Sequence, residues 1–261
     1  PAGGRIRVWI VLFDGCRIAK ILPRNLRSCP KRSAPFVYLP EFIYIRLSKI
    51  EGMIKNLVFD FGGVIADFEF SRALAAFERV GLKNPTEYLD SYHQRDFFMA
   101  LESGQIGADE FIRRLSECAG REVSYAEARE AWLGFFLMPV PVERLAALEE
   151  LRRDYRLYVL SNTNPFVMDW ARSSEFSPAG KPLDAYFDKL YLSYEMKCAK
   201  PEPEIFHRMA ADAPLVPAET LFIDDSQTNA AAGAAQGYRT LCPRSNSDWR
   251  EAVRQALEAD V

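Results

Sequence analysis

Short apolar segments alternate with longer segments of helical periodicity from residue 54 onward. Each apolar segment has the length of a buried strand, and the segments between them carry apolar residues at the spacing of one helix face. This alternation is typical of β-α units that build a parallel sheet. The predicted strands are Leu57–Phe59, Leu157–Leu160, Leu190–Leu192, Leu221–Ile223 and Tyr238–Leu241.

The stretch between the first two predicted strands has an almost wholly helical pattern. Ser124 and Glu127 have the spacing of a capping box and predict the start of a helix that contains Trp132. Pro141 suits the first turn of a later helix that carries Leu145. Earlier helices are predicted at Ser71–Val80, Thr86–Leu101 and Ala108–Cys118.

We therefore predict an α/β fold: a Rossmann-like parallel sheet with helices on both faces and a small α-helical cap inserted after the first strand. The expected core comprises residues 53–66 and 140–261, and the expected cap comprises residues 67–139. Residues 1–52 show no sustained period. We expect them to be an N-terminal appendage of unknown role, or the product of a misplaced translation start, whose deletion leaves a folded, active protein. A basic targeting or binding tail is the rival interpretation.

Composition narrows the class of protein. The chain has 261 residues, of which 49% are hydrophobic and 26% charged, so it can bury one large core or a core with a satellite domain. Residues 1–52 carry 10 Lys and Arg against 3 Asp and Glu, whereas residues 53–261 carry 23 against 33. An acidic body argues against a nucleic-acid partner, because phosphate contacts need clustered Lys and Arg.

Cysteine and hydropathy patterns bear on the compartment. The chain has 5 cysteines, an odd number, and none forms a C-x-x-C pair, which favours a reduced, cytoplasmic protein. The longest apolar run, Val8 to Phe13, is cut by Asp14 and is far shorter than the ~20 residues that span a bilayer. We therefore expect no membrane partner, and the pattern does not indicate an oligomeric state.

Polar residues follow three of the predicted strands. Asp60 follows the first, Ser161-Asn162-Thr163 the second, and Asp224-Asp225 a later one. Because the carboxyl ends of parallel strands lie along one edge of a sheet, we expect these residues to converge there. Paired carboxylates supply the oxygen ligands that Mg²⁺ prefers. The glycines at 62 and 63 permit a tight turn close to a phosphate or metal, and Lys200 could neutralise an anion.

In this order and spacing, the motifs resemble those of the haloacid dehalogenase superfamily over residues 54–245. The residues of these motifs are most similar to those of the branch that contains bacterial sugar-phosphate phosphatases and the phosphatase domain of soluble epoxide hydrolase. The matching motifs are Phe59-Asp60-Phe61-Gly62-Gly63-Val64, Leu160-Ser161-Asn162-Thr163-Asn164, Lys200-Pro201 and Ile223-Asp224-Asp225-Ser226-Gln227-Thr228-Asn229.

The resemblance implies a Mg²⁺-dependent phosphomonoesterase that acts on a small phosphorylated metabolite, with a sugar phosphate as the guess. Asp60 would attack phosphorus and form an aspartyl-phosphate that water hydrolyses. The implied Mg²⁺ ligands are Asp60, the backbone oxygen of Gly62, Asp225 and, directly or through a hydrogen bond, Asp224. Ser161, the Asn162 backbone and Lys200 would hold the phosphoryl oxygens, and Asn229 would organise the metal loop.

Gly62 departs from the pattern of most superfamily phosphatases, which have a second Asp there as general acid and base. General acid–base catalysis contributes a factor of about 10² to 10⁴ in rate, so its loss predicts a slow enzyme or one that prefers good leaving groups. Asp67 could supply the proton if the chain folds back, although a role as a helix or loop cap is more common for such a residue.

Three alternative functions remain open. A 2-haloacid dehalogenase also lacks the second Asp, but it works without metal and has no acidic pair like Asp224-Asp225. A phosphomutase would need the acid–base carboxylate that Gly62 does not provide. A catalytically weak, phospho-ligand-binding regulatory protein fits Gly62, although retention of Asp60 and Lys200 argues for turnover.

The predicted cap offers candidates for substrate contact. Its aromatic residues are expected to form core first and to wall a substrate pocket second. His93 and Arg95 are the polar candidates for substrate binding. The two histidines of the chain lie far apart and lack the spacing of a zinc site.

Overall fold

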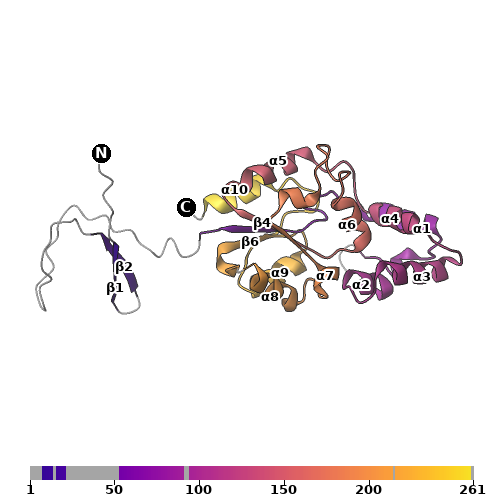
Figure 1. Cartoon of the computed structure of the whole chain (residues 1–261), viewed down its shortest axis with the longest axis horizontal. Coiled ribbons are helices and arrows are strands. Elements are labelled where there is room, and N and C mark those ends of the chain that lie inside the picture. Colours follow the sequence, from indigo (N-terminus) through magenta and orange to yellow (C-terminus); the bar gives the residue numbers. More distant parts are fainter. Residues whose placement is uncertain (1–7, 14–15, 22–52, 91–93, 214, 260–261) are drawn as a thin grey trace, which may run out of the picture. The chain divides into compact units, whose positions relative to one another are not determined.

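The computed structural model describes residues 8–13, 16–21, 53–90, 94–213 and 215–259 (Figure 1). The chain divides into two compact units, Pro1–Met53 and Ile54–Val261. Within the described residues, no helix combines the length and the apolar character needed to cross a bilayer.

The first unit contains one element pair that the sequence pattern did not predict. Strands β1 (Val8–Phe13) and β2 (Cys16–Ile21) pair antiparallel, with Phe13 opposite Cys16. Asp14-Gly15, which stands between them in the sequence, is a common dipeptide between paired strands and is the signal that the prediction missed. Most of the predicted appendage lies outside the described residues.

The second unit is built on a five-stranded parallel sheet with the order β5-β4-β3-β6-β7. The predicted α/β fold is thereby confirmed, and the five predicted strands are present, the last one shortened by a residue at its start. The strands are β3 (Asn56–Phe59), β4 (Arg156–Ser161), β5 (Lys189–Leu192), β6 (Thr220–Ile223) and β7 (Arg239–Leu241). Strand β3 lies in the centre of the sheet, between β4 and β6. Asp60, which follows β3, therefore lies between the residues that follow these two neighbouring strands.

Alternate residues of these strands contribute to two apolar layers, one on each face of the sheet, because side chains along a strand point to opposite faces. On one face, Val58 and Phe222 pack with Phe206 of α8 (Pro203–Asp212). On the other face, Phe59 packs against Trp249 at a ring distance of 5.0 Å, beside Leu148 of α5 (Val142–Leu151). Figure 1 shows α5 and α10 (Arg250–Glu258) on one side of the sheet and α8 and α9 (Gln227–Ala235) on the other, as predicted.

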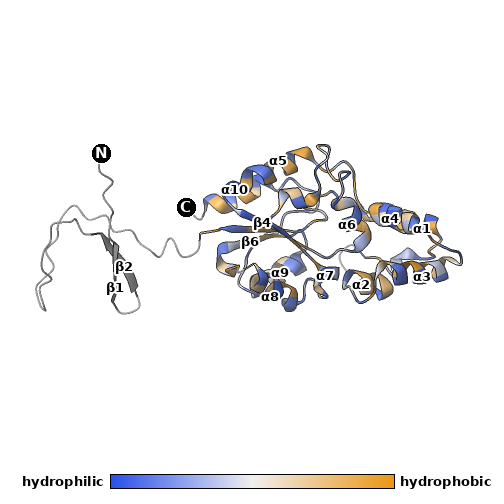
Figure 2. Ribbon diagram, viewed as in Figure 1, coloured by the Kyte–Doolittle hydropathy of each residue, from blue (hydrophilic) through white to orange (hydrophobic). Residues whose placement is uncertain are grey.

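The helices of the core lie between successive strands, except α10, which follows the last strand. They are α5 (Val142–Leu151), α6 (Pro165–Ala171), α7 (Ser193–Met196), α8 (Pro203–Asp212), α9 (Gln227–Ala235) and α10 (Arg250–Glu258), with short 3-10 turns η3 (Leu183–Tyr186) and η4 (Pro217–Glu219). Most helices carry both polar and apolar residues, as is typical of helices that cover a core with one face (Figure 2). Pro141 immediately precedes α5, within one residue of its predicted place.

Helices α1 to α4 form the predicted insertion between β3 and α5. They are α1 (Phe70–Val80), α2 (Asp96–Glu102), α3 (Ala108–Ala119) and α4 (Tyr125–Leu133), with the 3-10 turn η2 (Pro85–Glu87). The capping box is confirmed: Glu127 N donates to Ser124 Oγ at 3.2 Å, and Ser124 N donates to Glu127 Oε2 at 2.9 Å. Phe77, Phe98 and Trp132 pack ring against ring, with centroids 5.0 to 5.5 Å apart. This aromatic cluster forms the core of the insertion.

The single helix predicted at Thr86–Leu101 is wrong. Tyr88, Leu89 and Asp90 are not helical, and α2 starts only at Asp96. The amide of Gln94 satisfies both backbone groups of Asp90, since Asp90 N donates to Gln94 Oε1 at 3.2 Å and Gln94 Nε2 donates to Asp90 O at 3.4 Å. A side chain that bonds the local backbone in this way competes with the helix.

Candidate active site

Asp60 lies at the carboxyl end of the central strand. Its backbone N donates to Ile223 O of β6 at 2.8 Å, which continues the sheet one residue past β3 and fixes the direction of the side chain. Asp60 Oδ1 then accepts from Phe61 N at 2.7 Å. The convergence of strand ends expected from the sequence is observed here, because Asp224 follows the neighbouring strand β6.

Lys200 ties two carboxylates together. Its Nζ lies 2.9 Å from Asp60 Oδ1 and 2.7 Å from Asp224 Oδ2. The Lys200 side chain is 1% exposed and that of Asp224 is 0% exposed, so the pair is shielded from water. Asp224 also accepts from Ser226 N at 2.9 Å and from the amide of Asn229 at 3.2 Å. A fully buried carboxylate with this many donors is a fixed structural anchor for the lysine.

Asn162 holds the Lys200 backbone through both ends of its amide. Asn162 Nδ2 donates to Lys200 O at 2.8 Å, and Lys200 N donates to Asn162 Oδ1 at 2.8 Å. This reciprocal pair occupies both ends of the Asn162 amide, and Asn162 is among the residues that line the pocket. Ser161 is buried, donates from Oγ to Asn162 O at 3.3 Å and is not among the residues that line the pocket.

Gly63 makes room for Asp225. Its φ is +76°, a backbone conformation that glycine adopts readily, and a Cβ at this position would collide with the Asp225 carboxylate. The turn is closed by Gly63 N donating to Ala66 O at 2.8 Å and by Asn246 N donating to Gly63 O at 2.7 Å. The glycine therefore allows the carboxylate that follows β6 to lie against the turn that follows β3.

Burial is the largest influence on the pKa values of Asp60, Asp225 and Lys200. Burial raises the pKa of Asp60 to about 7, against the lowering effect of Lys200 and with a further rise from the charges of Asp224 and Asp225. Burial also raises the pKa of Asp225, opposed by a hydrogen bond from Ser245. For Lys200, burial lowers the pKa, but the charges of Asp224 and Asp60 outweigh it and raise the pKa overall.

The donor set fits a hard divalent cation. Carboxylate oxygens of Asp60, Asp224 and Asp225 lie within 4.8 Å of one another. Three carboxylates and the Lys200 ammonium leave two negative charges, the charge that a divalent cation would balance. Asn229 Oδ1, another oxygen donor in the pocket, is buried and has no hydrogen-bond partner. Oxygen donors of this kind suit Mg²⁺.

Asp67, the residue considered as a substitute proton donor, does not line the pocket. Asp67 Oδ1 lies 2.7 Å from Arg144 Nη1, and Arg144 also donates to Asn246 O at 2.9 Å. Asp67 does not line the pocket, so it acts as a structural ion pair. Gly62 does line the pocket, and a Cβ there would meet only Phe136 Cε1 at 3.9 Å, an ordinary contact. Nothing steric in the described residues requires glycine at this position.

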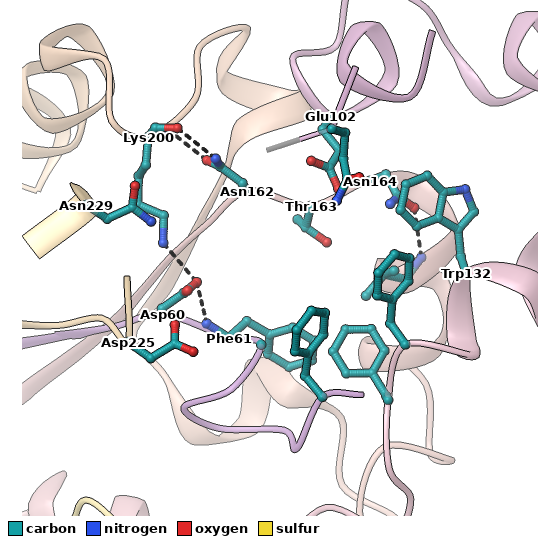
Figure 3. A pocket seen from close by; sticks show the side chains of 16 residues that line it. Asp60, Phe61, Glu102, Trp132, Asn162, Thr163, Asn164, Lys200, Asp225 and Asn229 are labelled. Carbon is teal, nitrogen blue, oxygen red and sulfur yellow. Dashed lines mark hydrogen bonds and ion pairs between the residues drawn. The ribbon is translucent and has the colours of Figure 1, made fainter. Parts of the chain in front are cut away.

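The pocket extends from these residues to the insertion and has two ends (Figure 3). We call Asp60, Asn162, Lys200, Asp225 and Asn229 the charged end. We call Glu102, Trp132, Thr163 and Asn164 the polar end. The remaining walls are largely aromatic and include Phe61, Phe68, Phe135 and Phe136. Chain segments far apart in the sequence therefore enclose one cavity, of about 100 Å³.

The charged end was predicted from the sequence, whereas the polar end was largely missed. Thr163 and Asn164 were noted only as parts of a motif, and Glu102 was not singled out. A signal for Asn164 existed, because an Asn before Pro165 is typical of a helix start. Glu102 ends a short apolar helix, and its position against the pocket depends on the tertiary arrangement.

Neither polar residue expected to contact substrate, His93 or Arg95, is found among the described residues that line the pocket. His93 lies outside the described residues. Arg95 is 63% exposed, lies 3.9 Å from Asp90 Oδ2 and does not line the pocket, whereas its neighbour Gln94 does. Of the aromatic residues of the insertion, Trp132, Phe135 and Phe136 line the pocket, and Phe98 lies in the core.

The sequence matches a family model described as a haloacid dehalogenase-like hydrolase over residues 54–237. It is 48% identical over 207 residues to a D-ribitol-5-phosphate phosphatase of Bacteroides thetaiotaomicron, a match that covers 79% of this chain and 100% of the relative.

Solved structures agree with these matches. A structure described as a HAD-like family hydrolase from Porphyromonas gingivalis is 40% identical, with a TM-score of 0.75, and the match covers 78% of this chain and 98% of that one. An aspartate-to-alanine variant of a HAD family enzyme from Bacteroides thetaiotaomicron, solved with magnesium and inorganic phosphate, is 37% identical. Its TM-score is 0.73, and the match covers 77% of this chain and 99% of that one.

Proposed function

Because this chain belongs to the haloacid dehalogenase-like hydrolase family, we propose that its pocket is the active site of a Mg²⁺-dependent phosphomonoesterase. The observation that carries this proposal is the grouping of Asp60, Asp225 and Lys200 at the charged end. A nucleophile, a metal-binding carboxylate and a fixed cation are the groups that phosphoryl transfer to a carboxylate requires.

Asp60 is the proposed nucleophile. One of its carboxylate oxygens attacks phosphorus, the bond between phosphorus and the ester oxygen breaks, and the departing alkoxide takes a proton from solvent water to leave as the alcohol. Water then attacks the aspartyl-phosphate, releases inorganic phosphate and restores the carboxylate. Bound Mg²⁺, held by Asp60, Asp225 and the Gly62 backbone oxygen, would offset the repulsion between the carboxylate and the phosphate dianion.

The neighbouring residues orient the nucleophile and the phosphoryl group. Lys200 Nζ, fixed by Asp224, lies 2.9 Å from Asp60 Oδ1, and we assign it the contact with the phosphoryl oxygens. We assign a second contact to the Asn162 backbone, because the Asn162 side chain is bound to Lys200. We assign Ser161 an indirect role, since its hydroxyl contacts Asn162 O and lies outside the pocket lining.

For the substrate we propose a phosphorylated sugar alcohol. Support comes from the Bacteroides thetaiotaomicron relative, named as a D-ribitol-5-phosphate phosphatase, which this chain matches over the whole length of that protein. The pocket supports a small ligand, because residues of the insertion and of the core line a cavity of about 100 Å³. The acidic pair Asp224-Asp225 disfavours a dehalogenase, which works without metal.

A phospho-ligand-binding protein without turnover is the second candidate, and Gly62 is the observation that favours it. The pocket-lining residue at this position has no titratable group, and Asp67 is committed to Arg144. The experiment below separates the two functions because a binding protein releases no phosphate.

The test is Mg²⁺-dependent phosphate release from D-ribitol 5-phosphate and from 4-nitrophenyl phosphate. We expect turnover with Mg²⁺, none with excess chelator, and a loss of at least about 10³-fold in Asp60→Asn. Asp154→Asn, the same change at an exposed position, should match the wild type. Folded wild-type protein that binds these phosphates but releases none would establish the binding protein instead.

A further inference from the structure

The polar end contains donors and acceptors that the protein itself leaves unpaired. Asn164 Oδ1 accepts from Phe166 N at 3.1 Å and from Val167 N at 3.2 Å, which caps α6 and fixes the orientation of the amide. The amide N must therefore point the other way: Asn164 Nδ2 is buried, interacts with the Glu102 carboxyl and lowers its pKa, but makes no full hydrogen bond. A buried donor without a full hydrogen bond is costly, so its retention in a pocket indicates a ligand group that accepts from it.

Thr163 repeats this arrangement with a hydroxyl. Its backbone is fixed by Ser193, because Thr163 N donates to Ser193 Oγ at 3.0 Å and Ser193 Oγ donates to Thr163 O at 3.2 Å. The Thr163 side chain is 4% exposed, and Oγ1 has no partner. In Figure 3 this hydroxyl points into the cavity between the two ends.

Glu102 faces these two residues from the insertion (Figure 3). The chain after Glu102 is held against the core, since Lys197 Nζ donates to Gly104 O at 2.7 Å. Gly104 has φ +64°, and a Cβ there would collide with Tyr194 O. Burial raises the pKa of Glu102 to about 8, opposed by the Asn164 amide and assisted by the charge of Asp60. A protonated carboxyl can donate to one hydroxyl and accept from another.

The charges of the pocket limit what can occupy this end. Among the described residues that line the pocket, Lys200 is the only Lys or Arg, and it is held by Asp60 and Asp224. No cation is left there to bind a second phosphate or a carboxylate. An uncharged tail that carries hydroxyls satisfies the unpaired groups without adding charge.

We infer that Glu102, Thr163 and Asn164 form a hydroxyl-binding subsite that selects phosphate esters with an uncharged polyhydroxylated tail. The inference rests on the proposed function, because the phosphate must lie at the charged end for the tail to reach the polar end. Thr163 and Asn164 are specificity-determining residues of the core, and Glu102 supplies the complementary group from the insertion. The subsite disfavours ester tails that carry a carboxylate.

The test compares kcat/KM for D-ribitol 5-phosphate with kcat/KM for 4-nitrophenyl phosphate, whose tail carries no hydroxyl. In Thr163→Val and in Glu102→Leu the ratio of the two should fall at least about tenfold, as expected for a lost hydrogen bond to a buried partner. Thr163→Ser keeps the hydroxyl and should hold the ratio within about threefold of wild type. Exposed controls with the same chemical changes are Thr240→Val and Glu130→Leu.

A matched substrate pair adds a second readout. Ribonate 5-phosphate, which replaces the terminal alcohol by a carboxylate, should be turned over at least about tenfold less efficiently than the alditol ester. If the wild type hydrolyses both main substrates while Thr163→Val and Glu102→Leu leave their ratio unchanged, the subsite is wrong and the phosphatase stands.

If the wild type releases no phosphate, the proposed function fails and binding decides the subsite. Affinities of Asp60→Asn for D-ribitol 5-phosphate and inorganic phosphate, measured by calorimetry with Mg²⁺, would then be compared with and without Thr163→Val. A selective loss of at least about tenfold for the ester supports the subsite. An equal effect on both ligands rejects it.

Discussion

The two ends of the pocket satisfy their polar groups in opposite ways. At the charged end, Lys200 Nζ lies 2.9 Å from Asp60 Oδ1 and 2.7 Å from Asp224 Oδ2. The charged groups there are therefore paired with one another within the protein. At the polar end, Thr163 Oγ1 is buried without a partner, and buried Asn164 Nδ2 interacts with the Glu102 carboxyl but makes no full hydrogen bond. The charged end is therefore preorganised for one chemical group, whereas the polar end depends on the ligand to complete it.

We therefore assign phosphoryl transfer to the charged end and substrate discrimination to the polar end. A charge network that already exists in the free protein needs no reorganisation when phosphorus is attacked. Unpaired donors discriminate strongly, because a ligand that lacks the matching hydroxyl leaves them unsatisfied. The predictions below alter one end and ask whether the other keeps its behaviour.

The largest effect is expected at Lys200. Lys200→Met leaves the buried carboxylates of Asp60 and Asp224 without their cation, which should cost roughly 3–5 kcal/mol of unfolding free energy and lower kcat by about 10³. Urea unfolding and phosphate release measure the two effects. Lys189→Met, which breaks an exposed pair with Asp212, is the control. A stable, active Lys200→Met protein would remove the basis of the preorganised charged end.

A pH-dependent stability effect is expected at the polar end. The pKa of Glu102 is about 8 in the folded protein, above its ordinary value of 4.5, so the stability it contributes is fully present below pH 4.5 and is lost as pH rises through about 8. Glu102→Gln cannot ionise. It should gain roughly 2–4 kcal/mol relative to wild type between about pH 4.5 and pH 8.5.

Denaturant unfolding at the two pH values measures the Glu102 effect, with Glu130→Gln as the exposed control. An equal difference between wild type and Glu102→Gln at both pH values would show that the carboxyl titrates normally in the folded protein.

Metal removal should affect the charged end next. A ligand that binds only the folded state at 100 times its Kd stabilises it by about 2.7 kcal/mol, so Mg²⁺ should raise the melting temperature over a chelator-treated sample. Asp225→Asn should reduce this increase by at least about half, because a carboxylate that can coordinate Mg²⁺ is lost. Calorimetry of both proteins and of Asp154→Asn checks this. Equal Mg²⁺ stabilisation in Asp225→Asn would place the ion elsewhere.

The smallest effect is expected at Gly62. A side chain there meets only Phe136 at 3.9 Å, so Gly62→Asp should fold normally. The new carboxyl can donate a proton to a leaving alkoxide, and we expect kcat for alkyl phosphates to rise by up to about tenfold, with little change for aryl phosphates. A parallel change for both classes would mean that protonation of the leaving group does not limit turnover.

Sequence patterns predicted the sheet and the charged end because both depend on local features. The apolar strands have a simple pattern, and strand order brings Asp60 and Asp224 together once the sheet is parallel. The single helix at Thr86–Leu101 failed because Gln94 bonds the Asp90 backbone instead, an interaction that periodicity does not encode. Glu102 was missed because its role depends on how the insertion meets the core.

The central claim is that Asp60 carries the phosphoryl group during turnover. Its most direct test is an acid quench of wild-type protein, Mg²⁺ and D-ribitol 5-phosphate within the first turnover, followed by mass spectrometry of the peptide that contains Asp60. We predict a phosphorylated Asp60 that forms and decays at the rate of turnover and is absent from Asp60→Asn. Full turnover with no phosphorylated Asp60 at any time, together with an active Asp60→Asn protein, would contradict the account.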